Sequence, residues 1–266
     1  MTTGKKEQQV KLFLSVNKMP DKLHHTKGIV LRTVKYGETS VIVSIYTELF
    51  GLQSYLVNGV RTSSKKGAGR ANLFQPSAVL DLVVYQNELK QLQRIKEFRW
   101  GCLYQHILSD VRKNAIAMFL VELLSKCVKQ PENNPDLFLF AEDALLHLDK
   151  ASDMVAANFP LFFALHLPVF FGLRINDNYS SDASVLDLQE GRFVESPPFH
   201  NMMLEGKQAF ITSQLLKVQH PEELEEMKLN HEWRRALLQA YEKYYLLHIQ
   251  DFGTLRTLPV LREVLG

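Results

Sequence analysis

The chain has 266 residues, of which 46% are hydrophobic and 23% are charged, as is ordinary for a soluble globular protein of one or two domains. Its two cysteines, Cys102 and Cys127, argue against a disulfide framework and fit a reducing cytoplasm. The net charge of +2 is unevenly distributed along the chain. Residues 22–100 carry 12 Lys/Arg against 5 Asp/Glu, whereas residues 101–266 carry 15 Lys/Arg against 22 Asp/Glu. This asymmetry predicts a polyanion-binding module joined to a module with a different task.

Residues 1–21 are expected to be an extension that precedes the folded protein. Their apolar patch at 10–16 is too short and too interrupted for a secretory signal with its cleavage site. Met19 is an alternative start of the folded chain.

Residues 27–100 have the pattern of a β-rich domain, because β-branched and aromatic residues dominate, alternation is frequent and most connections are short. Turns are expected at 37–38 and 87–88. Five strands in about 75 residues match a small closed barrel of the OB type, so we predict an OB-fold domain over 22–100. The expected strands are 28–36, 40–48, 52–60, 77–85 and 92–98.

The long connection between the third and fourth strands, 59–70, is the most suggestive segment for binding. It contains four cations and no acidic residue, together with hydroxyl side chains and glycines: Arg61, Lys65, Lys66 and Arg70 are the cations. Mobile cations and exposed backbone N–H groups can follow a phosphate backbone. The alternative is a solvated loop without a ligand.

Cations on the predicted strands favour the binding interpretation, because OB barrels bind single strands through a basic groove and aromatic stacking. These strand cations are Lys27, Arg32, Lys35, Arg94, Lys96 and Arg99. The candidate stacking platforms are Tyr36, Tyr46, Tyr55 and Phe74, for each of which packing in the barrel core is the favoured alternative.

Beyond residue 101 the period becomes helical, and we predict an all-α domain over 101–266 with a small insertion at 174–201. A helix over 103–129 is apolar on both sides, which places it at the centre of a bundle. Within the insertion, two strand-like pieces are expected to form a hairpin about Glu190-Gly191. Two further helices are expected at 135–148, which begins at Pro135, and at 159–173. A last helix is expected after the N-cap Asn230, and its core stripe is Trp233, Leu237, Ala240, Tyr244 and Leu247.

Residues 155–173 approach the length needed to span a membrane. They include Asn158, His166 and two prolines, and they lack flanking basic and aromatic anchors. We therefore expect a buried core helix that begins near Pro160, and no membrane association.

Catalytic motifs are missing from the sequence: there is no Walker-type phosphate loop and no G-x-S-x-G, and neither cysteine lies in a motif. Asp143 and His147 share a helical face, and an ion pair between them is favoured over a metal or proton-transfer site because no third ligand follows. The prediction is a non-enzymatic protein with no cofactor and no metal. A nuclease built from scattered carboxylates is the enzymatic alternative.

Several runs in the predicted barrel are similar to a known family. They are GIVLR at 28–32, YGETS at 36–40, TE at 47–48 followed by Gly51, NGVR at 58–61, and Gln75-Pro76. In these runs the chain resembles RecO, a bacterial recombination mediator and annealing protein. The resemblance is strong over 27–100 and rests on helical layout over 101–266.

The resemblance implies an OB barrel joined to a helical domain, with binding of single- and double-stranded DNA and annealing of complementary strands. It also implies two partners, RecR and the acidic tail of single-strand DNA-binding protein, during recombinase loading in the bacterial cytoplasm and nucleoid. Many members of the family carry a four-cysteine zinc module, but residues 174–201 contain no cysteine. We therefore expect the hairpin to close this region without zinc.

The tail of single-strand DNA-binding protein would need a cation for its carboxylate, and the candidates in the helical domain are Arg112, Lys113, Lys126 and Lys129. The alternative, which is at least as well supported, is that these four cations are solvent-facing helix charges with no role in binding a partner. An RNA-binding OB accessory factor is the alternative function, because OB barrels bind both polymers. For annealing, the hypothesis is that a basic surface screens the repulsion between two strands, so that no covalent step is needed.

Overall fold

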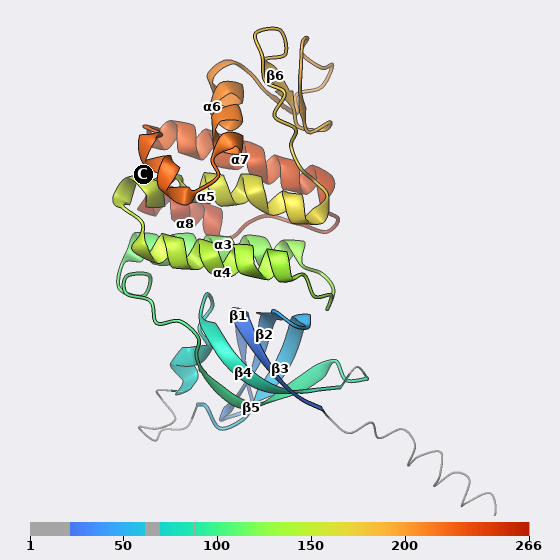
Figure 1. The fold of residues 1–266 in the computed structure, drawn as a ribbon, viewed down its shortest axis with the longest axis vertical. Helices are drawn as coiled ribbons and strands as arrows, with labels where there is room; N and C mark the ends of the chain where they lie inside the picture. The colour runs from blue at the N-terminus through green and yellow to red at the C-terminus, as the bar shows by residue number, and fades with distance from the viewer. Residues whose placement is uncertain (1–21, 62–69, 88, 266) are drawn as a thin grey trace, which may run out of the picture.

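The computed structural model describes residues 22–61, 70–87 and 89–265, which form a β-barrel and a stack of helices on one end of it (Figure 1). The strands close in the order β1-β2-β3-β5-β4, in which β3 and β5 are parallel and the other pairs antiparallel. The predicted OB-fold barrel is confirmed. Its strands are β1 (Lys22–Tyr36), β2 (Ser40–Thr47), β3 (Gly51–Val57), β4 (Val79–Gln86) and β5 (Leu92–Trp100).

Two strand boundaries differ from the prediction by three residues or more, and the others agree within two residues. β1 begins at Lys22, six residues before the predicted 28, because residues 22–29 pair with β4 although their sequence does not alternate. The strand then bulges between Val30 and Arg32 and continues along β2. β3 ends at Val57 instead of residue 60, and Gly59 with a φ of 68° turns the chain away.

The four predicted helices are present, and the sequence analysis missed α6 and α8. α3 lies at the centre in contact with α4, α5 and α8, and both of its apolar sides are buried, as predicted. The elements are α3 (Val111–Cys127), α4 (Pro135–Lys150), α5 (Asp153–His166), α6 (Gly206–Lys217), α7 (His231–His248) and α8 (Thr257–Val264), with 3-10 turns η1 (Asn72–Phe74), η2 (Leu167–Phe171) and η3 (Pro221–Glu226).

Three helix details correct the prediction. Residues 103–110 are a connection instead of helix, because Asp110 caps α3 by accepting the N–H of Arg112 and Lys113. α5 begins at Asp153, behind the cap Ser152, so that Pro160 lies inside the helix. In the stripe expected on α7, Leu247 is exposed to solvent.

The segment Asp153–Phe171 is long and apolar enough to cross a membrane by length and composition, and 67% of its apolar window is buried in the helical domain. Phe159, Leu161 and Phe163 are each at most 1% exposed. The segment is thus a core helix, as predicted.

The predicted hairpin in the insertion is confirmed as β6 (Val185–Asp187) and β7 (Arg192–Val194), and the sequence missed a third strand, β8 (Met203–Leu204). The Asn178 side chain fastens β7 by donating to the carbonyl of Phe193 at 2.8 Å and accepting its N–H at 2.9 Å. No group of three His, Cys, Asp or Glu in the part of the chain that the structure describes could hold a metal ion.

The barrel and the helical domain share one apolar core. Ile29 and Tyr46 are 0% and 1% exposed and pack with the buried side chains of the helices. The Tyr46 ring lies 6.2 Å from that of Phe138, and its hydroxyl donates to the carbonyl of Asn134 at 3.3 Å. Position 51 requires glycine, because a Cβ atom there would lie 2.1 Å from the carbonyl oxygen of Glu132 and would clash with it.

A buried carboxylate fixes the connection between the two parts. Asp149, 4% exposed at the end of α4, accepts the backbone N–H of Gln105, His106 and Ile107 at 2.8 Å each. Burial raises the pKa of Asp149, but the three N–H bonds lower it by more, so the pKa lies below its ordinary 3.8. Folding therefore stabilises the ionised form.

The Asp149→Asn variant is expected to lower the free energy of unfolding by about 2–3 kcal/mol, because a bond to a charged group contributes about 1.5–3 kcal/mol and an amide offers only one acceptor oxygen. Since the folded pKa is depressed, this stabilisation is fully present above about pH 4 and is lost as the pH falls through the folded pKa. Urea unfolding at neutral pH and near pH 3 measures both effects. Equal urea midpoints of the variant and the wild type at neutral pH would contradict a stabilising role for the three N–H bonds to Asp149. The control is Asp153→Asn, which changes a carboxylate in an exposed ion pair.

Candidate nucleic-acid interface

Rows of side chains cross the outside of β1, β2, β3 and the start of β5, because residues paired across neighbouring strands project from the same face of a sheet. The helical domain covers the row of Ile29, Tyr46 and Leu52. The rows beyond it stay open, and we call them the open face. They are Arg32–Ser44–Ser54–Leu92, Val34–Ile42–Leu56–Arg94 and Tyr36–Ser40.

The open face combines unpaired cations with exposed apolar side chains. Arg32 and Arg94 are exposed, and no carboxylate of the described residues lies within ion-pair distance of either. Tyr36 and Val34 are 54% and 45% exposed. A guanidinium contacts phosphate and an aromatic ring stacks on a base, so this composition suits a single nucleic-acid strand.

Three more predicted cations of the barrel have no carboxylate of the described residues within ion-pair distance. Exposed Lys35 precedes Tyr36 on β1. The Arg61 guanidinium donates to the carbonyl of Gly37 at 3.2 Å, which holds it at the β1–β2 turn. Arg70 lies 4.9 Å above the ring of Phe98. Lys65 and Lys66 lie outside the described residues.

The remaining predicted barrel cations lie away from the open face, next to carboxylates. Lys27 reaches Glu142 of α4 at 2.8 Å, and this hydrogen bond raises the pKa of the lysine. Arg99 pairs with Asp81 at 3.1 Å on the β4–β5 side. Lys96 lies 3.6 Å from Glu97. A paired cation releases fewer counterions on binding phosphate, so these three are weaker candidates.

Three of the four candidate stacking residues cannot stack on a ligand. Tyr55 and Phe74 are at most 1% exposed and lie in the barrel core, which was the favoured alternative for each. Tyr46 is 1% exposed for a different reason, because the helical domain covers it on the outer face of the barrel. The pKa of Tyr46 is raised to about 12 by burial. Tyr36 is the candidate that the structure leaves accessible.

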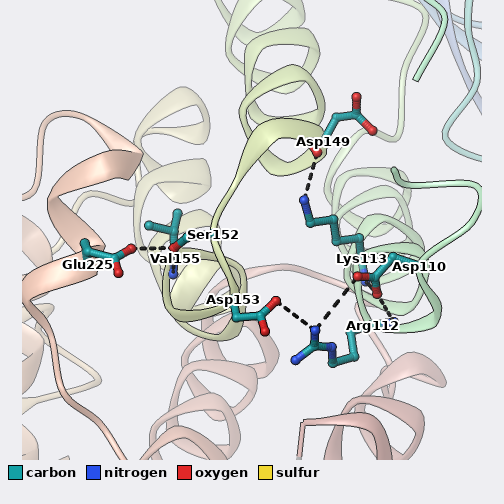
Figure 2. A network of polar contacts seen from close by, with 8 residues as sticks. All are labelled: Asp110, Arg112, Lys113, Asp149, Ser152, Asp153, Val155 and Glu225. Atoms are coloured by element: carbon teal, nitrogen blue, oxygen red, sulfur yellow. Dashed lines mark hydrogen bonds and ion pairs between the residues drawn. The ribbon is translucent and has the colours of Figure 1, made fainter. Parts of the chain in front are cut away.

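The candidate partner cations of the helical domain are mostly engaged inside the fold (Figure 2). Arg112 pairs with Asp153 at 2.7 Å. Lys113 is 7% exposed and donates to the carbonyl of Asp149 at 2.8 Å, so a partner cannot reach it, and its assignment to a partner surface is corrected. Lys126 donates to the carbonyl of Phe252 at 2.7 Å, and Lys129 to that of Asp251 at 3.3 Å.

The pairing expected between Asp143 and His147 is also different in the structure. His147 Nδ1 lies 2.8 Å from Glu222 Oε1 instead, which joins α4 to η3. The predicted Asp143–His147 pair is therefore wrong, because the partner of His147 comes from a distant part of the chain that i, i+4 spacing does not reveal.

A cationic pocket of about 70 Å³ lies between α7 and α8, and the sequence analysis did not identify it. Leucines form its apolar walls. Arg234 Nε donates to Asn158 Oδ1 at 2.9 Å, whereas Arg235 and Arg262 have no carboxylate of the described residues within ion-pair distance. The i, i+3, i+4, i+7 spacing of His231, Arg234, Arg235 and Leu238 was the available signal. The lining residues are His231, Arg234, Arg235, Leu238, Leu261, Arg262 and Leu265.

Comparisons with known proteins cover both parts of the chain. The family description "Recombination protein O N terminal" matches residues 19–101, and "Recombination protein O C terminal" matches residues 108–185. A "DNA repair protein RecO" of Bacteroides fragilis is 34% identical over 244 residues, which are 91% of this chain and 99% of that protein. A relative of the same name in Christiangramia forsetii is 32% identical, over 92% of this chain and 100% of that protein. Another in Flavobacterium johnsoniae is 29% identical, over 90% of this chain and 98% of that protein.

Proposed function

The chain belongs to the RecO family of bacterial DNA repair proteins, and from this premise we propose that it binds single- and double-stranded DNA and anneals complementary strands. With RecR, it assists recombinase loading on DNA coated by single-strand DNA-binding protein. The names of its relatives favour DNA repair over the RNA-binding alternative. We place this activity in the cytoplasm, at the nucleoid.

The observation that carries the proposal is the open face. Arg32 on β1 and Arg94 on β5 have no carboxylate of the described residues within ion-pair distance, and Tyr36 adds an exposed ring. The cations Lys35, Arg61 and Arg70 add to the positive charge of the barrel. Two DNA strands repel through their phosphates, and a surface that screens both lets base pairing proceed.

The proposed role needs no catalytic group. The carboxylates Asp110 and Asp149, whose pKa values lie below the ordinary range, are bonded to backbone N–H groups that cap α3 and fix the connection. Burial raises the pKa of the Cys127 thiol, which disfavours the reactive thiolate. Annealing by charge screening uses neither nucleotide nor metal.

For the tail of single-strand DNA-binding protein we propose the cationic pocket between α7 and α8. Arg235 and Arg262 are free for a carboxylate, and leucines beside them can receive an apolar side chain. This pocket replaces the cations Arg112, Lys113, Lys126 and Lys129, whose bonds are within the fold.

The Arg32→Ala/Arg94→Ala variant is expected to bind a single-stranded oligonucleotide more weakly, because two phosphate contacts are lost. The slope of log K against log salt should fall by about 1.4. Fluorescence anisotropy titrations at several salt concentrations measure both. Arg99→Ala, on the β4–β5 side, is the matched control, and an equal change in its slope would argue against the open face.

The Lys65→Glu/Lys66→Glu variant is expected to slow annealing of complementary oligonucleotides by roughly tenfold, because it reverses two charges of the 59–70 connection. Fluorescence quenching on strand pairing gives the rate. An unchanged rate and an unchanged salt slope would remove these two lysines from the site.

Binding of a tail peptide is expected to be lost in the Arg235→Ala/Arg262→Ala variant and retained in Arg112→Ala. A hydrogen bond to a charged group contributes about 1.5–3 kcal/mol, and isothermal titration calorimetry measures the resulting loss of affinity. Wild-type affinity in the double variant would exclude the pocket as the tail site.

A further inference from the structure

A depression of about 240 Å³ lies at one border of the open face, where β3, β4 and β5 meet the connection between β4 and β5. It is smaller than the pockets of about 300–1,000 Å³ that hold drug-sized ligands, so its size suits a single ring system. The side chains that line it are Leu56, Tyr85, Lys90, Leu92, Gln93 and Arg94.

The strand register explains why these side chains converge. Arg94 pairs with Leu56 of β3 on one side and with Tyr85 of β4 on the other, so the three project outward together. Leu92 precedes Arg94 by two residues and lies on the same side, 37% exposed. The depression therefore has an aromatic wall, two aliphatic walls and a guanidinium with no carboxylate of the described residues in reach.

The side chain of Gln93 holds the neighbouring connection in place. Gln93 is 3% exposed, and its Nε2 donates to the carbonyl oxygens of Asn87 at 2.8 Å and Lys90 at 2.6 Å. Its Oε1 accepts the N–H of Asn87 at 3.1 Å. These bonds hold the described residues Asn87 and Lys90 beside the depression.

We propose that this depression holds one unpaired nucleobase of a bound single strand. Tyr85 offers a stacking surface, Leu56 and Leu92 close the sides, and Arg94 can donate to a base oxygen or to the adjoining phosphate. This inference rests on the proposed function, because the depression continues the rows that carry Arg32 and Arg94. A base stacked and paired in a duplex cannot enter, so the site makes the open face selective for single strands.

The test compares Tyr85→Ala and Leu92→Ala with wild type on a single-stranded oligonucleotide and on its duplex, at one salt concentration. Loss of stacking is expected to weaken single-strand binding by about tenfold, while duplex affinity changes less than about twofold, since stacking contributes about 1–3 kcal/mol per base. Leu103→Ala removes a leucine that is 73% exposed and lies outside the barrel, and it is the control. A 2-aminopurine placed along the strand should change fluorescence on binding wild type and not on binding Tyr85→Ala.

Equal losses on single strand and duplex, or no loss on either, would overturn the base site while leaving the open face as a phosphate surface. A wild-type protein that binds no DNA would overturn the proposed function itself, and this result is seen before any substitution is made.

Discussion

The functional surfaces of this protein depend on how the helical domain covers the barrel. The helices bury one row of the outer face, at Ile29 and Tyr46, and leave the rows beyond it open. Burial of this apolar row gives the two parts a common core, and the buried carboxylate of Asp149 fixes the connection by accepting three N–H groups. The open face is therefore held in a fixed position relative to the helices.

The positions of the carboxylates then divide the barrel cations into two kinds. Lys27 and Arg99 neutralise Glu142 and Asp81, so they stabilise contacts within the fold. Arg32 and Arg94 face solvent without such partners. Net charge alone treats all of them alike, although only an uncompensated cation attracts phosphate at short range without first giving up a partner.

Much of the fold follows from local sequence. Alternation in the barrel strands, the cap at Asn230 and the hairpin about Gly191 are local signals, and each produces the expected element. Two strand segments were missed because their own sequences carry no alternating pattern. Residues 22–27 form a strand by pairing with β4, and β8, which pairs with β6, is too short to show a period. The site was less predictable, because exposure of Tyr36 and burial of Tyr55 depend on which side of a closed barrel each ring faces.

By itself, the sequence determined the barrel, the helical domain, the charge division near residue 100 and the family resemblance, because these depend on the order and type of residues. Only the tertiary structure decided which cations are free, that Lys113 is buried, and that Tyr85, Leu92 and Arg94 surround one depression. These facts depend on pairs far apart in the chain. Strand register and helix packing set those distances, and neither can be read from the local pattern.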